Sequence, residues 1–227
     1  MNLTISVLMP TRGRPDLLQQ AINSFYLTRV YPETELVLRI DTDDRDTNTY
    51  LSTIVDECDI KIVNGSRYNG YASSPQFYRE LIAASTGTLL MPANDDMIFR
   101  TSGWDLMIIE AFQLWPDLIG SVSPNALLNP DANPWGTVSR KWTDCIGGFA
   151  PQELMWTDAF VRDVSRALGR YQFLEHIIIE HVWAQHRRQE AREQESQFET
   201  PQYWRKHGQC VADAVSKLRP LMKDYNE

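Results

Sequence analysis

Apolar and polar positions near the start of the chain first follow a strand-like pattern and then a helix-like one. Residues 3–9 are mostly aliphatic or β-branched and end at Pro10, as expected of a buried strand. After a polar turn, apolar residues recur at helical spacing at Leu17, Leu18, Ala21, Ile22 and Phe25. Pro15 suits the first turn of such a helix. The pattern predicts a strand followed by a helix.

The same alternation continues to about residue 100. Further strands are predicted at 35–40, 59–63 and 88–93, and helices around 50–55 and at 75–86. Ser74 suits an N-cap and Gly87 a C-cap of the second of these helices. Strands that alternate with helices favour an α/β fold with a parallel sheet.

The second half of the chain is less regular. An amphipathic helix that Pro116 ends is predicted from Trp104, Ile108, Ala111, Phe112 and Trp115. We then expect a strand at 118–123, a long loop at 124–143, a helix at 158–168, an almost wholly polar run at 185–197 and a helical region from Thr200. The whole predicts a Rossmann-like, mostly parallel central sheet flanked by helices, with a helical or irregular C-terminal region.

Composition narrows the function classes. The 227 residues carry a net charge of -8 and a pI of about 5.1, which disfavours broad contact with nucleic acid or anionic membranes. The three cysteines, Cys58, Cys145 and Cys210, are far apart and indicate neither a disulfide framework nor a zinc site. No run of eighteen apolar residues and no signal-peptide pattern occurs. We expect a soluble, cytoplasmic protein without membrane insertion.

Polar clusters follow three of the predicted strands. They are PTRGR (10–14), DTDD (41–44) and NDD (94–96). In open α/β sheets, ligands bind at the carboxyl ends of the strands, so we interpret the three clusters as one site. Each cluster alone is equally compatible with ordinary turn chemistry.

Two familiar ligand motifs are excluded. The acidic run from Asp41 to Asp46 lacks the glycine and the final glutamate of an EF-hand loop. NGSRYNGY (64–71) lacks the Lys-Ser or Lys-Thr pair of a phosphate-binding loop, and the chain has no GxGxxG. Asp95 and Asp96 are different, because adjacent carboxylates repel each other unless they are solvated or share a cation. Their oxygen atoms favour Mg²⁺ or Mn²⁺.

The first hundred residues resemble GT-A glycosyltransferases of the family 2-like group. SVLMPTRGRPDLLQQAINSF (6–25) resembles their first strand, nucleotide-binding turn and first helix, and ASTGTLLMPANDDM (84–97) resembles the strand that leads to their metal-binding DxD motif. Asp41 falls where that family has a base-recognising aspartate. Two departures are Asn94 at the first DxD position and Arg79, where many relatives have a small or amide residue.

The resemblance implies a GT-A domain over 1–197, with a nucleotide-sugar and metal-binding half (1–100), an acceptor half (101–197) and a C-terminal helical extension (198–227). It implies a nucleoside diphosphate sugar donor, with a UDP-sugar favoured, and Mn²⁺ or Mg²⁺. The implied metal residues are Asp95, Asp96 and His181. The alternative for His181 is that it only packs beside Trp183. The implied nucleotide-binding residues are Pro10, Thr11, Arg12, Arg14, Asp41, Arg67, Asn94 and Asp95.

An inverting enzyme of this group also needs a carboxylate base for the acceptor proton. The resemblance assigns that role to Asp158, with Asp163 in reserve; the alternative is that Asp158 only stabilises a helix N-terminus. Around the expected acceptor loop, Trp135, Trp142 and Trp156 offer rings for stacking on sugars or bases.

Two rival functions remain open from the sequence. A sugar nucleotidyltransferase usually has a Gly-rich, Lys-bearing signature after the first strand, whereas PTRGRPD (10–16) has one glycine and no lysine. A non-catalytic nucleotide-sugar or glycan-binding module of the same fold is the other rival. The acceptor is a glycan, a small molecule or a hydroxylated DNA base, and the source that we expect is a bacterium or bacteriophage. The oligomeric state does not follow from the sequence.

Overall fold

The computed structural model describes residues 2–54, 58–68, 73–128, 136–182 and 199–223. The strands are β1 (Ile5–Thr11), β2 (Glu35–Asp41), β3 (Ile60–Gly65), β4 (Leu89–Pro92), β5 (Met97–Phe99), β6 (Ser121–Asn125), β7 (Thr137–Ser139) and β8 (Tyr171–His181). The helices are α1 (Pro15–Thr28), α2 (Arg45–Ile54), α3 (Ser74–Ala84), α4 (Trp104–Phe112), α5 (Arg140–Ile146), α6 (Thr157–Ala167) and α8 (Pro201–Leu218), followed by the short 3₁₀ helix η3 (Arg219–Leu221).

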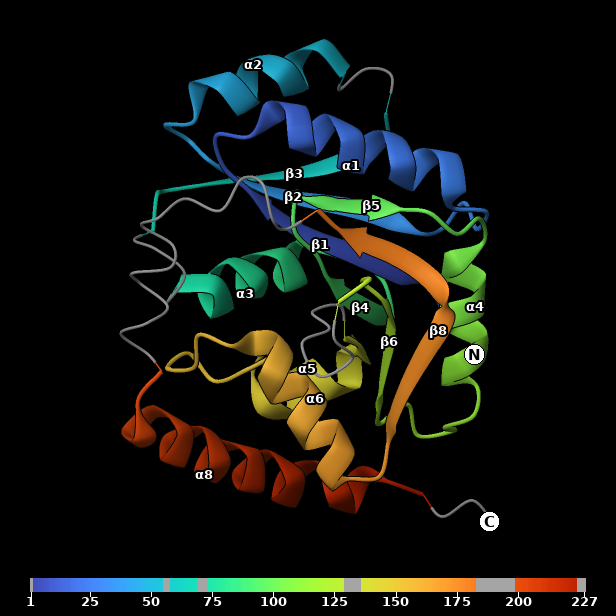
Figure 1. The fold of residues 1–227 in the computed structure, drawn as a ribbon, viewed down its shortest axis with the longest axis vertical. Helices are drawn as coiled ribbons and strands as arrows, with labels where there is room; N and C mark the ends of the chain where they lie inside the picture. The colour runs from blue at the N-terminus through green and yellow to red at the C-terminus, as the bar shows by residue number, and fades with distance from the viewer. Residues whose placement is uncertain (1, 55–57, 69–72, 129–135, 183–198, 224–227) are drawn as a thin grey trace.

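The strands form one sheet in the order β3-β2-β1-β4-β7-β6-β8-β5. The first four strands are mutually parallel, β7 is antiparallel to β4 and β6, β8 is parallel to β6, and β5 is antiparallel to β8. Helices lie on both faces of this sheet (Figure 1). The predicted α/β class is therefore confirmed.

Two hydrophobic cores, one on each face of the sheet, hold the layers together. Side chains of a strand alternate between its faces, so Ile5, Val7 and Met9 enter one core with α1 and α4. Leu8 enters the other core, which contains side chains from α3, α5, α6 and α8. Figure 1 shows α1 and α2 on the opposite side of β1 to β3 from α3.

The described elements agree with most of the predicted ones. The five apolar positions of α1 that the helical spacing identified are all buried. Trp104, Ile108, Ala111 and Phe112 of α4 lie in the core, and so does Trp115, which follows the end of the helix. Thr200 is the N-cap of α8, because its side chain accepts a hydrogen bond from the Tyr203 N–H at 3.1 Å.

The long loop predicted at 124–143 was wrong in its second part, which contains β7 and the start of α5. Three residues are too few for strand periodicity to be visible in the sequence. Ser139 ends β7 and caps α5, accepting from the Trp142 N–H at 3.2 Å. Trp142 is completely buried, so its predicted role in stacking on sugars was also wrong. Trp135 and the polar run 185–197 lie outside the described residues.

The C-terminal helix α8 packs against α5 and α6. Tyr203, His207, Ala214 and Leu218 form its buried face. No helix in the described part of the chain is both long enough and apolar enough to cross a membrane.

Candidate active site

The turn between β1 and α1 contacts both acidic clusters, 41–44 and 94–96. Thr11 donates its hydroxyl to Asp95 at 2.7 Å, and the Gly13 N–H donates to Asp44 at 2.7 Å. Gly13 has φ +63°, in the left-handed region that glycine adopts without strain. The carboxyl ends of parallel strands meet at one edge of a sheet, and here the side chains from β1, β2 and β4 touch. The structure therefore brings together the three clusters that the sequence analysis assigned to one site.

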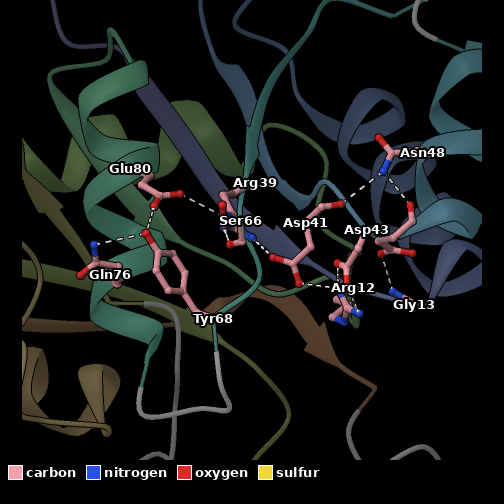
Figure 2. A network of polar contacts seen from close by, with 11 residues as sticks. Arg12, Gly13, Arg39, Asp41, Asp43, Asn48, Ser66, Tyr68, Gln76 and Glu80 are labelled. Carbon is pink, nitrogen blue, oxygen red and sulfur yellow. Dashed lines mark hydrogen bonds and ion pairs between the residues drawn. The ribbon is translucent and has the colours of Figure 1, made fainter.

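Asp41, at the end of β2, is held by two arginines. Its Oδ2 contacts the Arg12 guanidinium at 2.6 Å, and its Oδ1 pairs with the guanidinium of Arg39. Arg12 also contacts both carboxylate oxygens of Asp43, which lowers the pKa of Asp43. Figure 2 shows this continuous chain of contacts from Arg39 through Asp41 to Arg12.

Arg39 is a site residue that the sequence analysis missed. It is only 2% exposed, and it contacts Asp41, the Ser66 carbonyl and, at 3.0 Å, Glu80. Its guanidinium also lies 5.2 Å from the centre of the Tyr68 ring and 5.0 Å from that of Phe77. An arginine inside the apolar strand ELVLRID was a usable signal, because a buried guanidinium needs partners.

Gly65, at the end of β3, leaves room for that guanidinium. A Cβ at this position would lie 2.5 Å from Nη2 of Arg39, which is closer than two such atoms can pack. The backbone of β3 therefore passes directly against the side chain that orients Asp41.

Beside Arg12 and Asp43 lies an open cavity of about 420 Å³. It is lined by Arg12, Gly13, Asp43, Asp44, Arg45 and Asp46. Asp44 also stabilises the start of α2, since it accepts from the Thr47 N–H at 3.2 Å. The exposed Arg67 lies near enough to lower the pKa of Asp43 further. Pro10, in β1, is paired in register with Arg39.

Asp95 and Asp96 follow β4, and Arg14 lies between their carboxylates. The guanidinium of Arg14 pairs with Asp95 through Nη2 and with Asp96 through Nη1, the second contact being 3.2 Å. Asp95 is fully buried, and burial raises its pKa to about 6. Arg14 is thus one cation that the two adjacent carboxylates share.

His181, at the end of β8, meets Asp96 from the other side. Its Nε2 lies 3.1 Å from Oδ1 of Asp96. Burial alone would raise the pKa of Asp96, but His181 and Arg14 together lower it. Asn94, the first residue of the DxD-like motif, is half-buried. The late-strand histidine that the family resemblance implied does reach this carboxylate.

The residues around Asp96 suit a divalent ion in spacing and chemistry. An octahedral ion with ligands at about 2.1 Å holds adjacent ligands about 3 Å apart, close to the 3.1 Å between Nε2 of His181 and Oδ1 of Asp96. Carboxylate and imidazole together are suitable ligands for Mn²⁺. Within the described residues, no ready-made group of three or more His, Cys, Asp or Glu surrounds one metal position. Water and substrate oxygens would have to complete the coordination.

Asp158 lies in the first turn of α6 and is half-buried. Burial raises its pKa, although the N–H groups of Asp158 and Ala159 and the charges of Arg162 and His181 oppose the rise. Burial raises the pKa of Tyr78, and the negative charges of Asp158, Asp96 and Asp95 raise it further. Asp158 is therefore within electrostatic range of the residues that follow β4.

The C-terminal helix supports the start of α6. The Tyr203 hydroxyl accepts a hydrogen bond from the N–H of Trp156, the residue before α6, at 3.1 Å. Further along, Asp163 contacts His207 of α8 at 3.0 Å and Arg162 at 2.9 Å. These two partners lower the pKa of Asp163 although burial opposes them. Asp163 thus joins α6 to α8, whereas Asp158 lies in the first turn of α6.

No protein-family model matches the sequence, and no curated protein sequence matches it significantly. Solved structures are nevertheless similar. The mannosyltransferase PcManGT from Pyrobaculum calidifontis, in complex with GDP-Man and Mn²⁺, has a TM-score of 0.70 at 12% identity, over 97% of this chain and 74% of that one.

Two further structures are similar over different shares of their length. Glucosyl-3-phosphoglycerate synthase from Mycobacterium tuberculosis, in complex with Mn²⁺, UDP and glucosyl-3-phosphoglycerate, has a TM-score of 0.59 at 14% identity, over 98% of this chain and 82% of that one. TarS 1–349 from S. aureus, in complex with UDP, has a TM-score of 0.61 at 13% identity, over 78% of this chain and 59% of that one, less than two thirds of that structure. Taken with the sheet order, these similarities identify the fold of this chain as GT-A.

Proposed function

We propose that this protein is a glycosyltransferase that moves a sugar from a nucleoside diphosphate donor to an acceptor hydroxyl. The observation that carries the proposal is the convergence of Asp41, Asp95 and Asp96 on the turn at 11–14 in a GT-A fold, with Asp158 within electrostatic range. Structures of similar fold hold GDP-Man or UDP, which supports a nucleotide-sugar donor.

The nucleoside would bind in the cavity beside Arg12 and Asp43. Thr11, Arg12, Asp41 and Arg67 surround the ends of β1 and β2, and Pro10 provides an apolar edge. Uracil carries an N–H donor between two carbonyl acceptors, and guanine carries an N–H donor beside one carbonyl acceptor; both patterns match an aspartate beside arginines. A UDP-sugar is the first donor to test, followed by a GDP-sugar.

The diphosphate would lie between Arg14 and the Asn94-Asp95-Asp96 segment. Asp96, Asp95 and His181 would hold Mn²⁺ or Mg²⁺ there, and the ion, when bound, stabilises negative charge on the departing diphosphate. Two adjacent carboxylates and an imidazole at cis spacing support this assignment.

Asp158 would act as the general base of an inverting reaction. Its raised pKa suits proton uptake from an acceptor hydroxyl, because a base works best when its pKa approaches the working pH. The acceptor oxygen bonds to the anomeric carbon, the bond from that carbon to the diphosphate breaks, and the acceptor proton passes to Asp158. The contacts of Asp163 with His207 and Arg162 favour Asp158 over Asp163 for this role.

A donor panel tests the proposal. The full chain is incubated with UDP- and GDP-sugars, Mn²⁺ or Mg²⁺ and a mixture of candidate acceptors, and nucleoside diphosphate release and product masses are measured. We expect release with at least one donor, and its loss in Asp96→Ala. Asp59→Ala is the matched control, because Asp59 is exposed and lies just before β3, at the end of that strand away from Gly65. Pyrophosphate release from a nucleoside triphosphate would instead indicate a nucleotidyltransferase, and donor binding without turnover a binding module.

A further inference from the structure

Arg14 occupies the position of a cation in the candidate metal site. Each of the four carboxylate oxygens of Asp95 and Asp96 lies beside a hydroxyl group or a side-chain nitrogen. Those of Asp95 meet Thr11 and Arg14, and those of Asp96 meet Arg14 and His181. The single guanidinium of Arg14 bridges both side chains.

A guanidinium and a divalent ion compete for these oxygens. Arg14 presents only donors and always carries its charge, so it would repel an ion held by the same carboxylates. A metal at Asp96 therefore requires Arg14 to leave at least one of its two carboxylate contacts.

The position of Arg14 would allow its side chain to leave one of these carboxylates. Its side chain is 33% exposed and starts from the N-cap residue of α1. Asp95, by contrast, is completely buried and has no room to follow. Arginine binds phosphate through two parallel hydrogen bonds, so a donor diphosphate offers it an equally good anionic partner.

We propose that Arg14 is an exchangeable placeholder for the metal, so that metal binding depends on the donor. In the free protein Arg14 neutralises Asp95 and Asp96. When the nucleotide-sugar binds, its diphosphate takes over Arg14, and the carboxylates and His181 become available to the ion. This inference rests on the proposed donor site. It adds an ordered coupling: the diphosphate strengthens metal binding, and by linkage the metal strengthens diphosphate binding by the same factor.

The coupling is tested by direct titration of Mn²⁺ into the full chain, followed by electron paramagnetic resonance, with and without a nucleoside diphosphate. Wild type should bind Mn²⁺ weakly alone and at least about tenfold more tightly with UDP or GDP. Arg14→Gln should bind Mn²⁺ alone at least about tenfold more tightly than wild type, since a charge within about 4–6 Å shifts a neighbouring equilibrium by that order. The nucleotide should then add little.

Two further variants separate this effect from general charge or folding. Arg219→Gln removes an exposed guanidinium that donates to the Ala167 carbonyl, far from Asp95 and Asp96 in the sequence, and it should behave like wild type. Arg14→Lys keeps the charge without the bidentate fork and should fall between wild type and Arg14→Gln. Thermal melting of each variant reports whether it is folded.

Unchanged or weaker Mn²⁺ binding by a folded Arg14→Gln, with nucleoside diphosphate binding still measurable in wild type, overturns the exchange alone. Tighter Mn²⁺ binding by Arg14→Gln without nucleotide affinity in either protein overturns the exchange and the proposed donor site together. Metal affinity that follows total charge, with Arg219→Gln equal to Arg14→Gln, also overturns the exchange.

Discussion

The proposed donor end and the proposed acceptor end of the candidate site differ in how their carboxylates are held. At the proposed donor end, Asp41 and Asp96 are paired with arginines. At the acceptor end, Asp158 is stabilised by backbone N–H groups and more distant charges, and burial keeps its pKa high. Prepaired carboxylates suit the binding of a charged ligand, whereas a carboxylate with a raised pKa suits proton transfer. Changes at the two ends should therefore affect different measurements.

The largest effect is expected at Asp158. Asp158→Asn should reduce the rate of transfer by roughly a hundredfold or more, the usual scale for losing a general base, with donor and metal binding almost unchanged. In wild type, activity should fall as the pH drops through the raised pKa of Asp158, above the ordinary value of 3.8, because the base must be ionised. Single-turnover rates and donor titrations measure the two properties separately.

Asp163→Asn is the matched change on the same helix. Five residues along a helix rotate a side chain by about 140°, so both aspartates cannot face one reacting carbon. Transfer by Asp163→Asn should stay near that of wild type. Equal losses in the two variants, or a loss only in Asp163→Asn, would remove the distinction between the ends.

A smaller effect is expected for nucleoside binding at Asp41. Asp41→Ala should weaken binding of a free nucleoside diphosphate by about tenfold to a hundredfold, the range for a hydrogen bond to a charged group. The loss should persist in metal-free buffer, since Asp41 lies on β2 and the metal residues follow β4 and end β8. Calorimetric titration with and without Mn²⁺ is the measurement, and Asp59→Ala is the control. A loss seen only with metal would assign Asp41 to the diphosphate.

The smallest effect concerns the stability of the α6 to α8 contact. Asp163 is partly exposed, so Asp163→Asn should lower the free energy of unfolding near pH 7 by only about 1 kcal/mol. The folded pKa of Asp163 is lowered, so its contribution is complete above the unfolded pKa of about 3.9 and is lost as the pH falls through the folded value. Denaturant unfolding from pH 7 down to pH 3 should show the two proteins converging. A difference that stays constant would mean that the charge is not involved.

The sequence predicted much of the first half of the fold, because strands and helices there are long enough for their periods to be seen. Strand β1 is an example. Ile5, Val7 and Met9 enter the core on one face of the sheet, and Leu8 enters the core on the other face. The short strand β7 carries no such period, and its neighbours β4 and β6 are distant in sequence. It could not be found from local pattern.

The sequence pointed to most residues of the candidate site, but it did not show which side chains contact one another. Polar residues at three strand ends pointed to one edge of the sheet, and the described contacts join them there. The arginine that neutralises Asp96 lies 82 residues earlier in the sequence, and spacing alone does not reveal which cation meets which carboxylate. Likewise, α6 alone does not show that Asp163 meets His207 of α8.

Gly65 has an evolutionary consequence. It contributes no side chain, yet any other residue would place a carbon against the Arg39 guanidinium, which is confined by Tyr68 and Phe77. A substitution at position 65 would therefore be tolerated most readily together with a shorter residue at position 39, and that second change would leave Asp41 with one arginine in place of two. Positions 39 and 65 should therefore covary among homologues, and substitutions in β3 could change the contacts of Asp41 without any substitution of the aspartate itself.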